Sequence, residues 1–140
     1  MMPDKPPTIL VVEDDAFMAD LLRFLFERAQ MRVQVLADGR AALTHLEGAP
    51  NVDAVVLDWM LPQVSGLDVL RRLRAQPAWA QVPVLVLSAQ DAGSEVARAL
   101  QAGANDHMTK PFDPQVLMAR LARLLPATAA GADAGQAHAL

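Results

Sequence analysis

The sequence feature that most constrains the fold is a short apolar run that stops on a carboxylate. Val55, Val56 and Leu57 are followed at once by Asp58, and Pro62 comes soon after. Because the run is apolar on consecutive residues, it predicts a strand buried on both faces, as in the centre of a parallel sheet. Asp58 then lies at the carboxyl end of a central strand, where open α/β sheets bind ligands. Taken alone, an Asp in this position more often caps a turn.

The same pattern recurs along the chain and alternates with helical patterns. Strands are predicted at residues 8–12, 32–36, 55–58, 83–87 and 106–109, with the second at a sheet edge because it alternates. Apolar residues at helical spacing predict helices at residues 16–30, 39–46, 67–73, 94–102 and 114–125. Asp15 is a predicted N-cap and Gly103 a predicted C-cap. The alternation predicts an α/β fold whose parallel sheet is covered by helices on both faces.

The third predicted helix has a leucine face and a basic face. The basic face carries Arg71, Arg72 and Arg74. Charged side chains opposite an apolar stripe usually point into solvent, so we expect these three arginines to be solvated.

Length and composition predict one soluble domain. The 140 residues suit one domain, which we place at 8–125, after an N-terminal extension at 1–7 and before a flexible tail or linker at 126–140. No apolar segment approaches the ~18 residues of a membrane span, and no signal peptide is recognisable, so we expect a cytoplasmic protein that does not bind membranes. The net charge of −4 argues against direct nucleic-acid binding. Without cysteine, a metal must be held by oxygen or imidazole.

Acidic residues gather at two of the predicted strand ends. Glu13 and Asp14 follow the first strand, and Asp58 ends the third. If these strands are neighbours, the carboxylates meet at one rim of the sheet. Two carboxylates about 5 Å apart repel by roughly 3 kcal/mol at an effective dielectric constant of 20, so the cluster calls for a cation. A few oxygen ligands that leave room for water and a phosphoryl oxygen suit Mg²⁺ better than Ca²⁺.

The other strand ends carry groups that bind phosphoryl oxygens. Ser88 ends the fourth predicted strand and Lys110 follows the fifth, which adds a hydroxyl and a point cation. The set indicates phosphoryl transfer, with Asp58 as the nucleophile that forms an acyl phosphate. In this scheme Asp14 binds the metal directly, Glu13 binds it through a water, and the backbone carbonyl of Met60 is a third protein ligand.

These motifs resemble those of the receiver domain of bacterial two-component response regulators, the CheY-like superfamily. They are Val-Val-Glu-Asp-Asp at 11–15, Leu-Asp-Trp-Met-Leu-Pro at 57–62, Leu-Ser-Ala at 87–89 and Thr-Lys-Pro-Phe at 109–112, within a match over about 8–125. The resemblance implies a flavodoxin-like (βα)5 three-layer sandwich with sheet order 2-1-3-4-5. It also implies phosphotransfer to Asp58 from a sensor histidine kinase or a phosphotransfer protein, slow self-catalysed hydrolysis and a conformational switch, not a turnover enzyme.

The resemblance assigns further roles, and the chain departs from the family pattern at some of them. A cis peptide is implied between Lys110 and Pro111, and Ser88 is implied as a switch residue that contacts the phosphoryl group. His107 stands where similar proteins usually have Tyr or Phe, which puts the usual aromatic switch in doubt. On the face of the fourth helix, fifth strand and fifth helix, Val96 and Val116 stand where dimeric relatives carry a basic and an acidic residue. We therefore expect a monomer or a weak dimer through this face.

Two other functions fit parts of the pattern. A haloacid-dehalogenase-type phosphohydrolase shares the Asp, Mg²⁺, Ser/Thr and Lys set, but it needs a second acid two residues after the nucleophile, where this chain has Met60. A flavodoxin-like cofactor carrier would need a phosphate cradle after the first strand, where Glu13 and Asp14 would repel the phosphate. The output is open: the chain is either a stand-alone receiver that binds an output protein or a piece of a protein with a C-terminal effector domain.

Overall fold

Strands and helices alternate throughout the computed structural model, which describes residues 5–89 and 93–126. The elements are β1 (Thr8–Val12), α1 (Ala16–Arg28), β2 (Arg32–Leu36), α2 (Gly39–His45), β3 (Ala54–Asp58), α3 (Gly66–Ala75), a 3-10 helix η1 (Pro77–Trp79), β4 (Val84–Ala89), α4 (Gly93–Gln101), β5 (Asp106–Lys110) and α5 (Pro114–Leu124). Within these described ranges, none of the helices has the length and apolar character that crossing a membrane requires. The tail predicted at 126–140 lies almost wholly outside the described residues.

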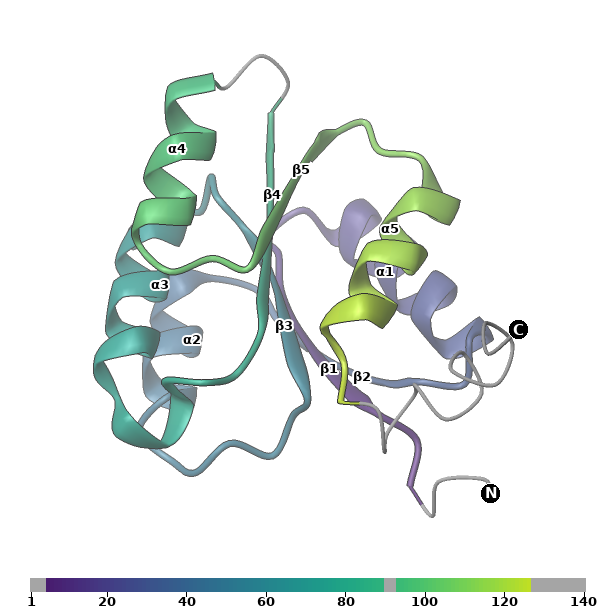
Figure 1. Cartoon of the computed structure of the whole chain (residues 1–140), viewed down its shortest axis with the longest axis horizontal. Coiled ribbons are helices and arrows are strands. Elements are labelled where there is room, and N and C mark those ends of the chain that lie inside the picture. The colour runs from purple at the N-terminus through teal and green to yellow at the C-terminus, as the bar shows by residue number, and fades with distance from the viewer. Residues whose placement is uncertain (1–4, 90–92, 127–140) are drawn as a thin grey trace.

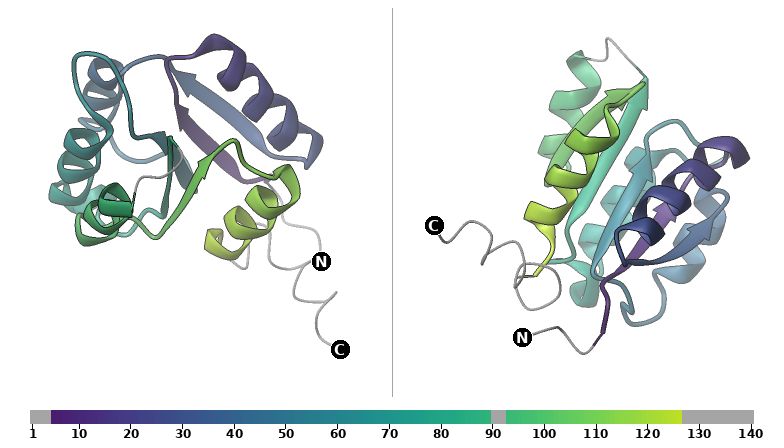
Figure 2. Two further views of the ribbon diagram at one scale, coloured as in Figure 1. Left: turned by 90° about the horizontal axis from the view of Figure 1, so that it is seen from above. Right: turned by 90° about the vertical axis from the view of Figure 1, so that its right-hand side faces the viewer.

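The five strands form one parallel sheet in the order β2-β1-β3-β4-β5, which confirms the predicted topology. The sheet separates two helical layers, with α1 and α5 on one face and α2, α3 and α4 on the other (Figures 1 and 2). Strand β3 lies between β1 and β4, and the register pairs Val12 with Leu57. The next residues, Glu13 and Asp58, therefore leave the sheet side by side at the point where the strand order reverses.

The strands are apolar on consecutive residues because each face of the sheet has its own core. Beneath α1 and α5, the buried residues are Ile9, Val11, Leu22, Phe26, Met31, Ala54, Val56, Leu85, Leu87, Met108, Leu117, Leu121 and Leu125. Beneath α2, α3 and α4, strand residues such as Leu10, Val55 and Val86 pack with Leu70, Leu73 and Trp79. Successive strand residues point to opposite faces, so both cores draw on the same strands. The structure thus confirms the prediction that β3 is buried on both faces.

Local signals set most helix ends. The side chain of Asp15 accepts from the backbone N–H of Phe17, which caps α1 as predicted. Gly103 has φ +112°, and the N–H groups of Gly103 and Ala104 donate to the carbonyls of Leu100 and Ala99. This is a Schellman C-cap, and it confirms the predicted end of α4.

Some predicted boundaries were wrong. Helix α1 ends at Arg28 and not at residue 30, since Gln30 has φ +70°, outside helical backbone. Strand β4 ends one residue later than predicted, at Ala89, so Ser88 is not its last residue. The 3-10 helix η1 was not predicted, and it starts at Pro77, which suits the first position of a helix.

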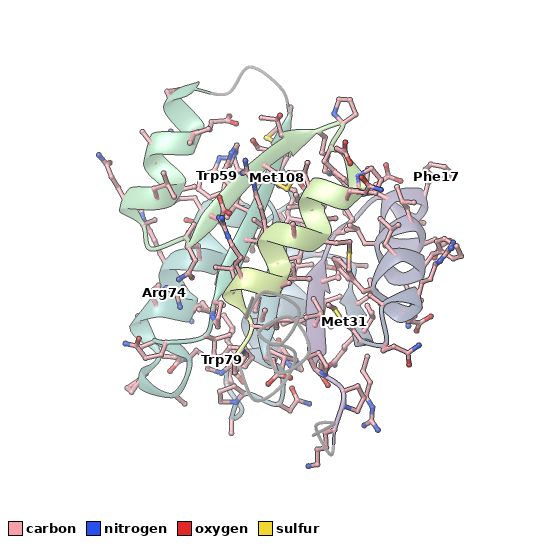
Figure 3. All side chains as sticks on the ribbon, turned by 45° about the vertical axis from the view of Figure 1, so that its right-hand side comes forward. Phe17, Met31, Trp59, Arg74, Trp79 and Met108 are labelled. Atoms are coloured by element: carbon pink, nitrogen blue, oxygen red, sulfur yellow. The ribbon has the colours of Figure 1, made fainter. Side chains whose placement is uncertain are left out.

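The prediction of a solvated arginine face was wrong for Arg74. Its guanidinium donates to the backbone carbonyls of Gly103 (3.0 Å), Trp79 (3.2 Å), Ala80 (3.1 Å) and Val82 (2.7 Å), and to the side-chain oxygen of Asn105 (2.8 Å). Figure 3 shows Arg74 and Trp79 towards the same end of the molecule, away from Trp59. Arg74 therefore ties α3 to η1 and to the turn between α4 and β5, whereas Arg71 and Arg72 are exposed as predicted.

Each edge strand is contacted by an arginine of the helix beside it. On β2, the carbonyl of Val33 accepts from Arg23 of α1 at 3.4 Å. On β5, the carbonyl of His107 accepts from Arg120 of α5 at 2.9 Å, and Arg120 also pairs with Asp106 at 3.4 Å. Both open edges of the sheet thus carry a cationic side chain.

Candidate functional site

Three carboxylates meet at the carboxyl ends of β1 and β3. One oxygen from each of Glu13, Asp14 and Asp58 lies within 4.8 Å of the other two. Glu13 is 2% exposed and Asp58 is 5% exposed, whereas Asp14 is open to solvent. The strand order reverses here, so the predicted meeting of these acids at the switch point of the sheet is what the structure shows.

Lys110 reaches this cluster from the end of β5. Its Nζ lies 2.9 Å from Oε1 of Glu13 and 3.5 Å from Oδ2 of Asp58. The peptide bond between Lys110 and Pro111 is cis. One ammonium group faces three carboxylates, so the cluster keeps an excess of negative charge that a further cation would neutralise.

Backbone groups fix the acidic side chains. The N–H of Met60 donates to Oδ1 of Asp58 at 3.1 Å, and the N–H of Asp15 donates to Oε2 of Glu13 at 3.2 Å. Since these bonds hold one oxygen of each carboxylate, Oδ2 of Asp58 and Oε1 of Glu13 are the oxygens that face Lys110. The carbonyl of Met60 was predicted as a metal ligand, whereas this role of its N–H group was not predicted.

Gly66 was also missed, and it supports the strand end that carries Asp58. Its N–H donates to the carbonyl of Trp59 at 3.0 Å, and a Cβ atom on Gly66 would lie 2.5 Å from the carbonyl oxygen of Asp58. No side chain fits at that distance. Ser65 caps α3 by accepting from the N–H of Asp68, so Gly66 is the first residue of that helix. A glycine directly after a capping serine was the sequence signal for a close backbone contact at this helix start.

The pKa values of Asp58 and Lys110 are both raised, for different reasons. Burial, then the neighbouring Glu13, raises the pKa of Asp58 to about 7, although Met60 and Lys110 oppose the rise. Burial alone would lower the pKa of Lys110, but the hydrogen bond with Glu13 and the charge of Asp58 outweigh it, so this pKa is raised. An anionic Asp58 is therefore costly in the bare site, and a bound cation would stabilise it.

The donor set fits a magnesium ion. The clustered ligand atoms are carboxylate oxygens, and the described residues offer no imidazole to this group. Hard oxygen donors with excess negative charge and one solvent-exposed member match the preference of Mg²⁺ for a few carboxylates and several waters.

Ser88 and His107 form a buried pair on the neighbouring strands β4 and β5. Oγ of Ser88 lies 2.7 Å from Nε2 of His107, and both residues are buried. Ser88 follows Leu87, which is the register partner of Asp58 in β4. Burial is the main cause that lowers the pKa of His107, so the ring is neutral at pH 7. The structure thus brings together the predicted side chains Glu13, Asp14, Asp58 and Lys110, and it places Ser88 near the carboxyl end of the adjacent strand β4.

Comparison with known proteins identifies the family of the chain. The family model described as response regulator receiver domain matches residues 9–122. The chain is 42% identical over 125 residues to the alkaline phosphatase synthesis transcriptional regulatory protein SphR of Synechococcus elongatus, a match that covers 84% of this chain and 48% of that protein. It is 41% identical over 120 residues to the phosphate regulon transcriptional regulatory protein PhoB of Rhizobium meliloti, covering 85% and 52%. The chain thus spans about half the length of these relatives.

One similar solved structure is described with a magnesium ion in its site. The receiver domain of a sensor histidine kinase from Pseudomonas aeruginosa, described with a magnesium ion coordinated in its active site cleft, superposes with a TM-score of 0.78 at 32% identity and covers 85% of this chain and 97% of that one. These comparisons do not support the phosphohydrolase alternative. The fold, the site and the family match agree, and the chain belongs to the response regulator receiver domain family.

Proposed function

We propose that Asp58 accepts a phosphoryl group from a phosphohistidine of a sensor histidine kinase or phosphotransfer protein. A carboxylate oxygen of Asp58 attacks phosphorus, a P–O bond forms as the P–N bond breaks, and the electron pair of that bond stays on the imidazole nitrogen of the donor. Water later cleaves the acyl phosphate, which returns the Asp58 carboxylate and releases inorganic phosphate. The observation that carries this proposal is Lys110 within 3.5 Å of a buried Asp58 inside a cluster of acids.

The neighbouring residues have separate roles in this proposal. Lys110 neutralises charge on the oxygens of the transferred group, and the N–H of Met60 holds one oxygen of Asp58 so that the other is presented to the donor. Asp14, Asp58 and the carbonyl of Met60 would hold Mg²⁺, with Glu13 bound through a water. Bound Mg²⁺ supplies charge neutralisation between the carboxylates and the phosphoryl oxygens.

A donor protein would meet an exposed aromatic side chain beside this site. Phe17 is 80% exposed and lies in the first turn of α1, three residues after Asp14. Figure 3 shows it at the periphery of the molecule, pointing away from the core. A protein that brings a phosphohistidine to Asp58 can cover Phe17 at the same time, and burial of this ring would add to its affinity.

The output partner is proposed from the relatives. SphR and PhoB are transcriptional regulators, and the matches cover 48% and 52% of their lengths, so we propose that this receiver controls an effector domain or an output protein and not nucleic acid directly. The face formed by α4, β5 and α5 carries Val96 and Val116, and we propose a monomer or a weak apolar dimer there. As for other members of the family, we propose a cytoplasmic location.

Phosphorylation by a small donor tests the proposal directly. Purified protein is incubated with acetyl phosphate and Mg²⁺, and intact mass and peptide mapping locate the adduct. We expect one phosphoryl group per chain on the peptide that contains Asp58, none without Mg²⁺, and none in Asp58→Asn. The matched control is Asp68→Asn, which removes an exposed acid of α3 and should leave the stoichiometry unchanged. Equal phosphorylation of Asp58→Asn would show that another residue is the acceptor.

A further inference from the structure

The hydroxyl of Ser88 has one proton and two possible acceptors in the structure. Nε2 of His107 lies 2.7 Å away, and the carbonyl oxygen of Ala89 lies 3.4 Å away. The longer contact is close to the limit for a hydrogen bond, whereas 2.7 Å is typical of a hydroxyl donor. Of the two acceptors, Nε2 is the better placed, and it takes the hydroxyl proton in the tautomer whose ring proton is on Nδ1.

The neutral state of the ring agrees with this assignment. A neutral imidazole has one nitrogen that accepts and one that donates, so Nε2 accepts from Ser88 when the ring proton is on Nδ1. Ser88 is fully buried between β3 and β5, so its hydroxyl finds no competing partner in bulk water. Phe at position 107 would leave the hydroxyl without this acceptor, and Tyr would have its oxygen further from the ring.

We propose that His107 competes with the phosphoryl group on Asp58 for the hydroxyl proton of Ser88. This inference rests on the proposed function. To donate to a phosphoryl oxygen, Ser88 must break its bond to Nε2, so His107 acts as a positioning residue that opposes the phosphorylated form. The register places the three residues on the adjacent strands β3, β4 and β5, and a change at Asp58 therefore reaches the exposed edge strand through one hydroxyl group.

Protonation of His107 removes the competition. An imidazolium has no acceptor nitrogen, so it donates to Oγ and leaves the hydroxyl proton of Ser88 free for a phosphoryl oxygen. The charged groups around the ring are Asp106 on β5, Glu95 on α4 and Arg120 on α5. The two acids favour the imidazolium and Arg120 opposes it, so this switch responds to pH below the ordinary range of histidine.

The test compares the parent with His107→Phe by titration with beryllofluoride in the presence of Mg²⁺, where beryllofluoride stands in for the phosphoryl group. We expect about fivefold tighter binding by His107→Phe at pH 8, the effect of one hydrogen bond that no longer has to be broken. The ratio of the two affinities should approach one near pH 5, and titration of Asp58 cancels because both proteins contain it. His45→Phe, the same change at a residue that packs against Trp79, should match the parent at every pH.

A spectroscopic arm observes the ring nitrogen in the parent protein itself. In ¹⁵N-histidine spectra of the parent, Nε2 of His107 should show an accepting, unprotonated nitrogen, and its resonance should shift when beryllofluoride binds. His107→Phe identifies the signal. If both proteins bind beryllofluoride with equal affinity at all pH values, or the signal of Nε2 does not move on binding, the competition is refuted while the proposed function stands. If the parent does not bind beryllofluoride at all, the proposed function fails and the competition with it.

Discussion

Replacement of Arg74 by methionine should lower the free energy of unfolding far more than the same replacement of Arg71 or Arg72, the other arginines of α3. Methionine keeps an apolar stem of similar length but removes the five guanidinium contacts to Gly103, Trp79, Ala80, Val82 and Asn105. Three of the acceptors, the carbonyls of Gly103, Ala80 and Val82, lie outside helices and strands, where no ladder partner can replace the lost donor, whereas the carbonyl of Trp79 also accepts from the N–H of Val82.

The magnitude follows from the contacts. Nη1 has two N–H groups for three acceptors, so the five contacts amount to at most four full hydrogen bonds. Bonds from a charged donor contribute about 1.5–3 kcal/mol each, but Arg74 is only half-buried, so water takes over part of the lost bonding. Two bonds at the lower end of that range give an expected loss of about 3 kcal/mol in the free energy of unfolding.

Urea denaturation followed by circular dichroism measures this loss. Arg71→Met is the matched control, because Arg71 lies on the same helix, is exposed, and makes none of the hydrogen bonds found among the described residues. Its effect should stay within about 0.5 kcal/mol. Equal midpoints for Arg74→Met and Arg71→Met would refute the view that Arg74 ties these turns together.

Three further predictions concern charge. Burial and Glu13 raise the pKa of Asp58 to about 7, so between about pH 4 and pH 7 the folded state keeps this proton while the unfolded state loses it, and stability falls as pH rises. Asp58→Asn should therefore raise the free energy of unfolding more at pH 8 than at pH 4, and chemical denaturation at the two pH values measures the difference. Protons also compete with Mg²⁺, so Mg²⁺ affinity, followed by the fluorescence of Trp59, should weaken as pH falls through about 7, and a flat profile would contradict the raised pKa. With Val96 and Val116 in place of a charged pair, any dimer formed with beryllofluoride should persist at high salt in light scattering, and steep dissociation as salt rises would show that ion pairs hold it.

The fold was predictable because its signals are local or periodic. The apolar runs before Glu13 and Asp58 identified two buried strands, and Gly103 identified the end of α4 by its left-handed backbone. The positions of Asp58 and Lys110 at one rim follow from strand direction alone, since all parallel strands end at the same edge. Their contact across β4 is visible only in the structure.

The remaining features depend on contacts that a single sequence does not encode locally. The bond between Ser88 and His107 depends on the register of β4 against β5, which no local pattern specifies. Arg74 is of the same residue type as Arg71 and Arg72. The one sequence signal that distinguishes it is its position four residues after the buried Leu70, which places it at the margin of the apolar face of α3. The support from Gly66 depends on a close approach of two backbones, which is visible only in three dimensions.

The arginines at the sheet edges have a consequence for behaviour at high concentration. An open edge strand can pair with the edge of another molecule, and such pairing starts strand-mediated aggregation. Arg120 donates a hydrogen bond to the carbonyl of His107 on β5, and Arg23 donates one to the carbonyl of Val33 on β2. An incoming strand would have to displace an arginine side chain at either edge. Concentrated solutions should therefore resist the growth of intermolecular sheets.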